Sequence, residues 1–79
     1  MNTYLRDILV GDLKLDPAGL RPGARIDDAG MDSLSLVELG LLLSERHGVD
    51  IGEEVLASAR TVGALARIVE EHIDARGPR

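Results

Sequence analysis

The sequence has 79 residues, no cysteine, one aromatic residue and a formal net charge of −5 at pH 7. A chain of this length is expected to form a single domain over residues 1–79, too small for a deep pocket of catalytic groups, and without cysteine it has neither disulfides nor thiolate metal sites. The acidic charge and the single ring of Tyr4 argue against nucleic-acid binding, and the lack of both a signal peptide and an apolar run of roughly 18 residues predicts a cytoplasmic protein that does not enter a membrane.

The first helix is predicted from about Thr3 to Leu13, where apolar residues recur at helical spacing. A long connection follows, Lys14 to Asp32, which contains two prolines and three glycines. Its apolar members Leu20 and Ile26 are expected to hold it against the core. A connection of this length without secondary structure is usually functional in a compact domain.

The second helix is predicted over Ser33 to His47. Asp32 is the expected N-cap, and Gly48 stands where a left-handed residue commonly ends a helix. A competing start lies at Ser35, because Ser35 and Glu38 have the spacing of a capping box.

A short third helix is predicted over Glu53 to Ala59, where acids in the first turn favour the positive end of the helix dipole. Thr61 is expected to cap a last helix, whose apolar stripe continues to Ile73. Residues 76–79 are interpreted as a frayed tail. These elements predict an all-α fold, a four-helix bundle of three main helices and a short third one, with a long loop after the first helix.

The second helix carries more apolar residues than one amphipathic stripe needs, and by helical spacing they divide into two faces. The face expected in the core comprises Leu36, Leu39 and Leu43. The other face, termed the apolar strip, comprises Leu34, Val37 and Leu41. Glu38 and Glu45 flank the apolar strip, and an exposed apolar surface rimmed by carboxylates is typical of a partner-binding site. The alternative is a helix buried on two sides, with Leu34 or Leu41 in the core.

Acidic residues are concentrated in the middle of the chain. Residues 26–56 contain eight acids and one base, Arg46, whereas the flanking segments are nearly neutral. This distribution favours a basic partner that docks on the middle segment. The alternative is charge that serves only solubility.

Four short motifs in chain order resemble the acyl carrier protein family. They are Gly30-Met31-Asp32-Ser33-Leu34, Val37-Glu38-Leu39, Gly48-Val49-Asp50-Ile51 and Thr61-Val62. The first motif alone is weak, but the whole set at fitting distances is specific and spans the chain from the first helix to the last.

The resemblance implies that Ser33 receives a 4′-phosphopantetheine arm from coenzyme A through a phosphopantetheinyl transferase. A serine at the start of a helix suits this modification, because the free N–H groups and the helix dipole favour a phosphodiester there. The arm supplies a thiol that this sequence lacks, and it would carry acyl cargo as a thioester. The resemblance therefore implies a monomeric carrier with no catalytic residues of its own and no metal site.

The resemblance also implies transient docking of pathway enzymes, such as an acyltransferase or ligase and a ketosynthase, on the second helix. The implied partner-binding residues are Asp32, Leu34, Val37, Glu38, Leu41, Glu45, Glu53 and Glu54.

Three positions depart from the commonest family pattern. Ala29 replaces a leucine, His47 an aromatic residue and Gly52 a proline. These departures favour a carrier of polyketide or related fatty-acid-like biosynthesis over one of primary fatty-acid synthesis. Two other functions stay open: an aminoacyl or peptidyl carrier of nonribosomal peptide assembly, and an unmodified helical domain that binds a partner through the apolar strip.

Overall fold

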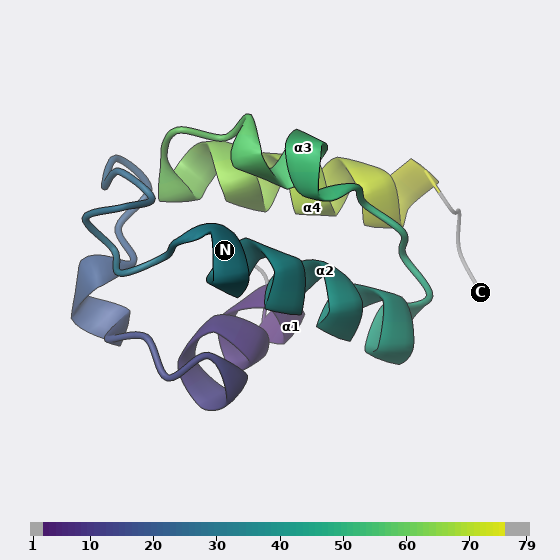
Figure 1. Cartoon of the computed structure of the whole chain (residues 1–79), viewed down its shortest axis with the longest axis horizontal. Coiled ribbons are helices and arrows are strands. Elements are labelled where there is room, and N and C mark those ends of the chain that lie inside the picture. Colours follow the sequence, from purple (N-terminus) through teal and green to yellow (C-terminus); the bar gives the residue numbers. More distant parts are fainter. Residues whose placement is uncertain (1–2, 76–79) are drawn as a thin grey trace.

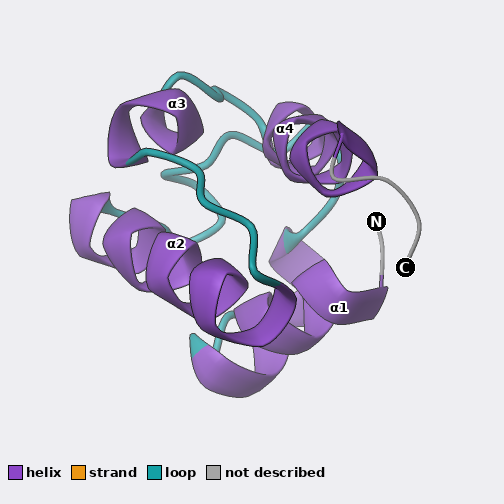
Figure 2. Cartoon of the chain, turned by 90° about the vertical axis from the view of Figure 1, so that its right-hand side faces the viewer, coloured by secondary structure: helices purple, strands orange, loops and turns teal. Residues whose placement is uncertain are grey.

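The computed structural model describes residues 3–75, and all of the regular structure in that range is helical. The elements in chain order are α1 (Thr3–Arg6), η1 (Asp7–Asp12), η2 (Pro17–Gly19), α2 (Ser33–His47), α3 (Glu53–Ala57) and α4 (Val62–Ala75). Figure 1 shows α2 running between α1 on one side and α3 with α4 on the other. Seen along the bundle in Figure 2, α2 and α3 form one side and α1 and α4 the opposite side. The predicted all-α bundle is confirmed, and the tail expected at 76–79 lies outside the described residues.

The first predicted helix is present, but most of it is wound more loosely than an α-helix. After Arg6 the chain continues as a π-helical segment, η1, which ends at Asp12 with Leu13 as its C-cap. The amide of Leu13 donates to the carbonyl of Ile8 at 2.9 Å, five residues back instead of four. Lys14 then takes a left-handed conformation, with φ of 62°, and turns the chain out of the helix. The apolar spacing predicted the end of this helical stretch within a residue, but it does not distinguish these two kinds of helix.

The long loop after η1 is held against the start of α4. Leu20 is buried, as expected, and the amide of Val62 donates to the carbonyl of Ala24 at 2.9 Å. The amide of Gly63 donates to the carbonyl of Pro22, also at 2.9 Å. A Cβ atom at Gly63 would lie 2.9 Å from the Pro22 carbonyl oxygen, closer than real Cβ contacts. Glycine at position 63 is therefore needed for the loop to approach the helix.

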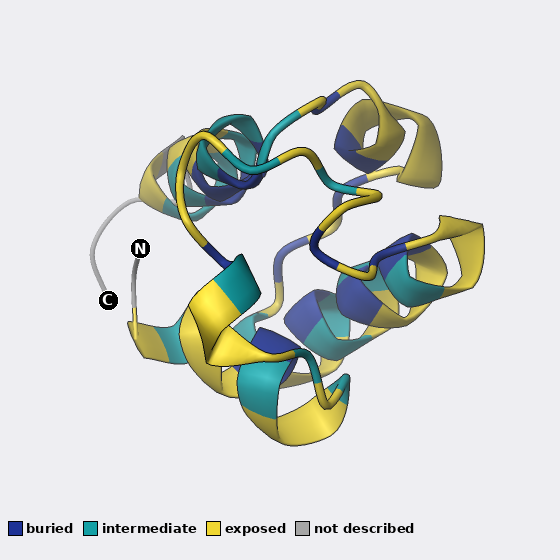
Figure 3. Cartoon of the chain, turned by 90° about the vertical axis from the view of Figure 1, so that its left-hand side faces the viewer, coloured by how far each residue is buried: buried dark blue, intermediate teal, exposed yellow. Residues whose placement is uncertain are grey.

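The core is closed by one face of each main helix. Leu36, Leu39 and Leu43 are buried, so the predicted core face of α2 is confirmed. From α1 and η1 the chain buries Leu5, Ile8 and Leu9, and from α4 it buries Val62, Leu65, Ala66 and Val69. Figure 3 shows the buried residues of the helices turned toward the interior and the exposed ones toward solvent.

Of the two C-terminal helices, α3 is shorter than expected, and α4 begins where it was expected. α3 ends at Ala57, two residues before the predicted end, and the Ser58 hydroxyl donates to the Val55 carbonyl at 2.6 Å. This local side-chain hydrogen bond competes with continuation of the helix. The expected cap of α4 is confirmed, because the Thr61 hydroxyl oxygen accepts from the Ala64 amide at 3.1 Å.

An ion pair joins the far end of α2 to the end of η1. Arg46 donates to both carboxylate oxygens of Asp12, at 2.6 and 2.7 Å. The hydrogen bonds lower the pKa of the Asp12 carboxyl and raise the pKa of Arg46. Nearby, the ring of His47 lies 5.0 Å from that of Tyr4 between centroids. The one base of the acidic middle segment is thus engaged within the fold.

Candidate functional site

Ser33 is the first residue of α2, and its side chain is exposed. The preceding residue, Asp32, has extended backbone geometry, and its Oδ1 atom accepts from the Ser35 amide at 2.9 Å and from the Ser35 hydroxyl at 3.1 Å. Asp32 is therefore the N-cap, and the competing helix start at Ser35 is wrong. Because the cap uses the side chain of Asp32, the hydroxyl of Ser33 is left to face solvent at the helix entrance.

The turn before Ser33 is fixed by the backbone conformation of Gly30 and by the burial of Met31. Gly30 takes a left-handed conformation, with φ of 92°, which an L side chain rarely adopts. Met31 follows it with only 4% of its surface exposed, and its amide donates to the carbonyl of Ile26 at 3.1 Å. The buried Met31 side chain thus anchors the chain directly before the Asp32–Ser33 pair.

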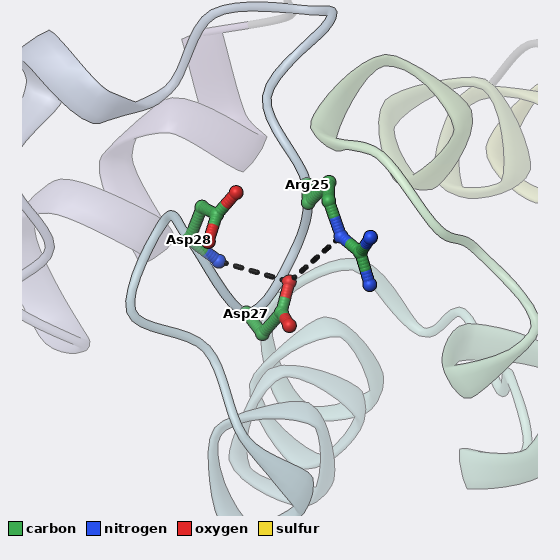
Figure 4. A network of polar contacts seen from close by, with 3 residues as sticks. All are labelled: Arg25, Asp27 and Asp28. Atoms are coloured by element: carbon green, nitrogen blue, oxygen red, sulfur yellow. Dashed lines mark hydrogen bonds and ion pairs between the residues drawn. The ribbon is translucent and has the colours of Figure 1, made fainter.

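The loop makes a further polar contact one turn earlier. In Figure 4 the Asp27 carboxylate accepts from the Asp28 amide at 3.0 Å and from Arg25 Nε at 3.4 Å. These contacts are exposed, so they contribute little to stability. They nevertheless organise the chain that leads to Gly30.

An open hollow of about 530 Å³ lies beside Ser33. Its lining includes Ile26 and Met31 from the loop, Ser33 and Leu36 from α2, and Arg60 after α3. The hydroxyl therefore stands at the edge of an open surface hollow and is accessible from solvent.

The electrostatics at this helix entrance favour an anion. The pKa of the Asp32 carboxyl is held below its ordinary value, first by the hydrogen bond from the Ser35 amide and then by the Ser35 hydroxyl. The 15-residue helix α2 also directs the positive end of its dipole toward Ser33. A phosphate ester on the hydroxyl would meet the remaining free N–H groups of the first turn. The residues present therefore fit a phosphate-linked group.

The apolar strip of α2 is open to solvent. Leu34 is 64% exposed, Leu41 58% and Val37 45%, so the alternative of a helix buried on two sides is wrong. Val55 of α3 is also exposed, at 42%, and sequence reasoning missed it because a helix of five residues has too few positions to show a periodic pattern. Within residues 3–75 these four are the large apolar side chains that stay exposed, and all of them lie on α2 and α3.

The expected acidic residues lie on the same two helices. Glu38 and Glu45 are exposed on α2, and Glu53 and Glu54 are exposed in the first turn of α3. Asp32 is exposed beside Ser33. In the described part of the chain no three acidic or histidine side chains come together in a way that could hold a metal ion. No helix among residues 3–75 is long and apolar enough to cross a membrane.

Comparison with known proteins identifies relatives over most of the chain. The family model described as "Phosphopantetheine attachment site" matches residues 3–69. Proteins named acyl carrier protein MbtL, from Mycobacterium bovis and from two strains of Mycobacterium tuberculosis, are each 39% identical over 66 residues, or 82% of this chain and 79% of theirs. No solved structure gives a significant match.

The Asp32 cap predicts a specific dependence of stability on pH. Since the pKa of Asp32 is lower in the folded chain than its ordinary value of 3.8, its contribution to stability is complete above that pH and is lost as the pH falls through the folded pKa. Asparagine caps helices as well as aspartate does but has no carboxyl to titrate. We expect Asp32→Asn to fold and to lose less stability than the parent chain between pH 5 and pH 2.

The free energy of unfolding from urea titrations at several pH values measures this effect. Ser35→Ala removes the hydroxyl donor but keeps the amide donor. It should therefore reduce the loss of unfolding free energy between pH 5 and pH 2 by less than Asp32→Asn does. If the free energy of unfolding falls equally with pH below 5 in Asp32→Asn and in the parent chain, the cap does not lower the pKa of Asp32.

Proposed function

The chain belongs to the acyl carrier protein family, whose members hold their cargo on a covalently attached 4′-phosphopantetheine, and from this membership we propose that Ser33 is the attachment residue. The family, the cofactor and the role of a carrier without catalysis, all predicted from the sequence motifs, are confirmed. When bound, the arm supplies a terminal thiol that forms thioesters with acyl groups. Partner enzymes of this family include phosphopantetheinyl transferases and the enzymes of the pathway served.

The exposed hydroxyl at the start of α2 is the observation that supports Ser33. The two residues before it hold it in place, since Met31 is buried and Asp32 caps the helix by accepting from the Ser35 amide. In the transfer the Ser33 oxygen would form a bond to the phosphorus of the phosphopantetheine unit, the diphosphate bond of coenzyme A would break with adenosine 3′,5′-bisphosphate as the leaving group, and the hydroxyl proton would pass to a base of the transferase. The resulting phosphodiester stays at the positive end of α2, where the dipole and the first-turn N–H groups stabilise it.

Incubation of the chain with coenzyme A and a broad-specificity phosphopantetheinyl transferase tests this assignment. We expect the intact mass to increase by that of one phosphopantetheine, and we expect no increase in Ser33→Ala. Ser58→Ala is the matched control, because Ser58 is another exposed serine that lines the same hollow, and this variant should be modified like the parent chain. Modification of Ser33→Ala would refute Ser33 as the attachment site. Absence of modification in the parent chain would refute it as well.

We propose further that the cargo is an acyl group of polyketide or related fatty-acid-like biosynthesis. The relatives named acyl carrier proteins support acyl over aminoacyl cargo. The departures at Ala29, His47 and Gly52 support a pathway other than primary fatty-acid synthesis.

Loading of the modified chain distinguishes the two cargo classes. We expect an acyltransferase or acyl ligase to charge the arm thiol, and we expect adenylating enzymes of nonribosomal peptide assembly to leave it uncharged. The mass of the thioester formed identifies the cargo. Efficient aminoacylation without acylation would instead favour the peptidyl carrier.

We also propose that partner enzymes dock on the apolar strip and on the acids around it. Docking would cover Leu34, Val37 and Leu41, with Asp32, Glu38, Glu45, Glu53 and Glu54 steering basic surfaces toward them. Exposed carboxylates raise the rate of encounter more than the affinity, and a small apolar area adds modest affinity. This combination suits a carrier that must leave each enzyme.

Leu41→Glu tests the docking surface. Because Leu41 is 58% exposed, the substitution should leave the fold intact. It places a charge in the middle of the proposed contact, so we expect KM for the transferase to rise by about tenfold or more, as for loss of a well-buried contact of about 1.4 kcal/mol. Ala18→Glu adds the same charge at an exposed position on η2 and should leave KM unchanged. Equal KM values for the two variants would argue against this surface.

A further inference from the structure

A shallow depression of about 290 Å³ lies between α2 and α3. Its lining includes Val37, Gly40 and Leu41 from α2, Glu53 and Leu56 from α3, and Ile51 just before α3. Val37 and Leu41 also belong to the apolar strip, so the depression opens within the proposed docking surface.

Gly40 contributes to this depression through its missing side chain. A Cβ atom at position 40 would lie 3.5 Å from the Ile51 carbonyl oxygen and 3.5 Å from Cδ1 of Leu56. Both distances are ordinary van der Waals contacts, so packing of α2 against α3 does not require glycine here. Glycine is nevertheless unfavourable in a helix interior, by about 1 kcal/mol relative to alanine. Alanine at position 40 would stabilise the helix, but its methyl group would also fill part of the depression.

Resting on the function proposed above, we propose that this depression receives one apolar side chain of the phosphopantetheinyl transferase, flanked on the enzyme by lysine or arginine residues that face Glu53 and Glu38. The depression has room for a single large apolar side chain, since its volume lies at the lower end of the range of about 300 to 1,000 Å³ for sites that enclose whole small molecules. An apolar anchor in a pocket, surrounded by polar contacts, is a common centre of binding energy in protein interfaces.

The position along α2 points to the transferase in particular. Gly40 lies seven residues after Ser33, which is about two helical turns and roughly 10.5 Å along the same face. The transferase must close on the Ser33 hydroxyl itself, whereas enzymes that act on the cargo work at the far end of the arm. An interface of ordinary size, about 800 Å² per partner, that is built around Ser33 includes the depression.

The exposed side chains around the depression favour an enzyme over the acyl cargo as the occupant. An acyl chain in the depression would leave most of Leu34, Leu41 and Val55 in water, where they are 64%, 58% and 42% exposed. A protein surface covers these side chains and the depression together. The carboxylate of Glu53 on the rim also pairs with a basic protein surface, but it offers nothing to a hydrocarbon.

Gly40→Ala tests the proposal through the kinetics of arm transfer to the unmodified chain. We expect KM for the chain to rise roughly fourfold to fifteenfold, the loss that corresponds to one or two excluded methylene contacts, while kcat stays unchanged because the lost contact is equal in the ground and transition states. Gly11→Ala is the matched control, because a Cβ atom at Gly11 meets nothing within 4 Å and Gly11 belongs to η1, whereas the proposed docking residues lie on α2 and α3 or directly before α2. Thermal unfolding of both variants verifies that each is folded.

The remaining outcomes separate the proposal from its alternatives. An unchanged KM in folded Gly40→Ala, or a fall in kcat alone, would overturn the anchor site. Absence of modification in the parent chain would instead refute the function proposed for Ser33. If an octanoyl thioester stabilises the modified parent chain more than an acetyl thioester does, and Gly40→Ala abolishes the difference, the depression holds cargo and the proposal fails.

Discussion

The hydrogen bonds from Ser35 to the Asp32 carboxylate determine where α2 begins, and the rest of the surface depends on that start. Successive residues of an α-helix are about 100° apart around its axis. A start at Ser35 would leave Ser33 and Leu34 in the preceding turn, without a helix dipole behind the hydroxyl. With Asp32 as the cap, Ser33 stands at the entrance while Leu36, Leu39 and Leu43 enter the core. The same register turns Leu34, Val37 and Leu41 toward solvent. The Asp32 carboxylate thereby relates the proposed attachment residue, Ser33, to the surface proposed for partner docking.

The far end of α2 is fixed by contacts of a different kind. Gly48 ends the helix in a left-handed conformation, with φ of 64°, and Arg46 pairs with Asp12 through two hydrogen bonds. The pair is partly exposed, so its main consequence lies in how charge is distributed. The guanidinium of Arg46 hydrogen-bonds to Asp12, and of the acids around the apolar strip it interacts electrostatically with Glu45. Residues 26–56 contain eight acids and one base, Arg46. In the fold Arg46 is hydrogen-bonded to Asp12 of η1.

Local patterns were sufficient to predict the part of the fold that matters most for function. The cap residues of α2 and α4, the bounds of α2 and the division of its leucines follow from spacing along one helix, where each signal involves residues within a few turns. Sequence reasoning missed interactions that join distant segments, namely the Asp12–Arg46 ion pair and the contact of Gly63 with Pro22. The π-helical form of η1 was missed because its apolar spacing fits an α-helix equally well. The exposure of Val55 was missed because the five residues of α3 are too few to show a face.

A carrier needs a surface that partners recognise but do not hold, and the α2–α3 side offers one physical solution. Four exposed apolar side chains give a small contact area, so binding that depended on area alone would be weak and poorly selective. The depression at Gly40 adds a requirement of shape without adding much area, because only an enzyme with an apolar side chain at the right place fills it. The missing side chain costs the helix some stability, and the complete burial of Leu39 and Leu43 on the core face of α2 offsets that cost. Recognition by a space in the surface is thus compatible with rapid release, since little apolar surface has to be re-exposed when the partner leaves.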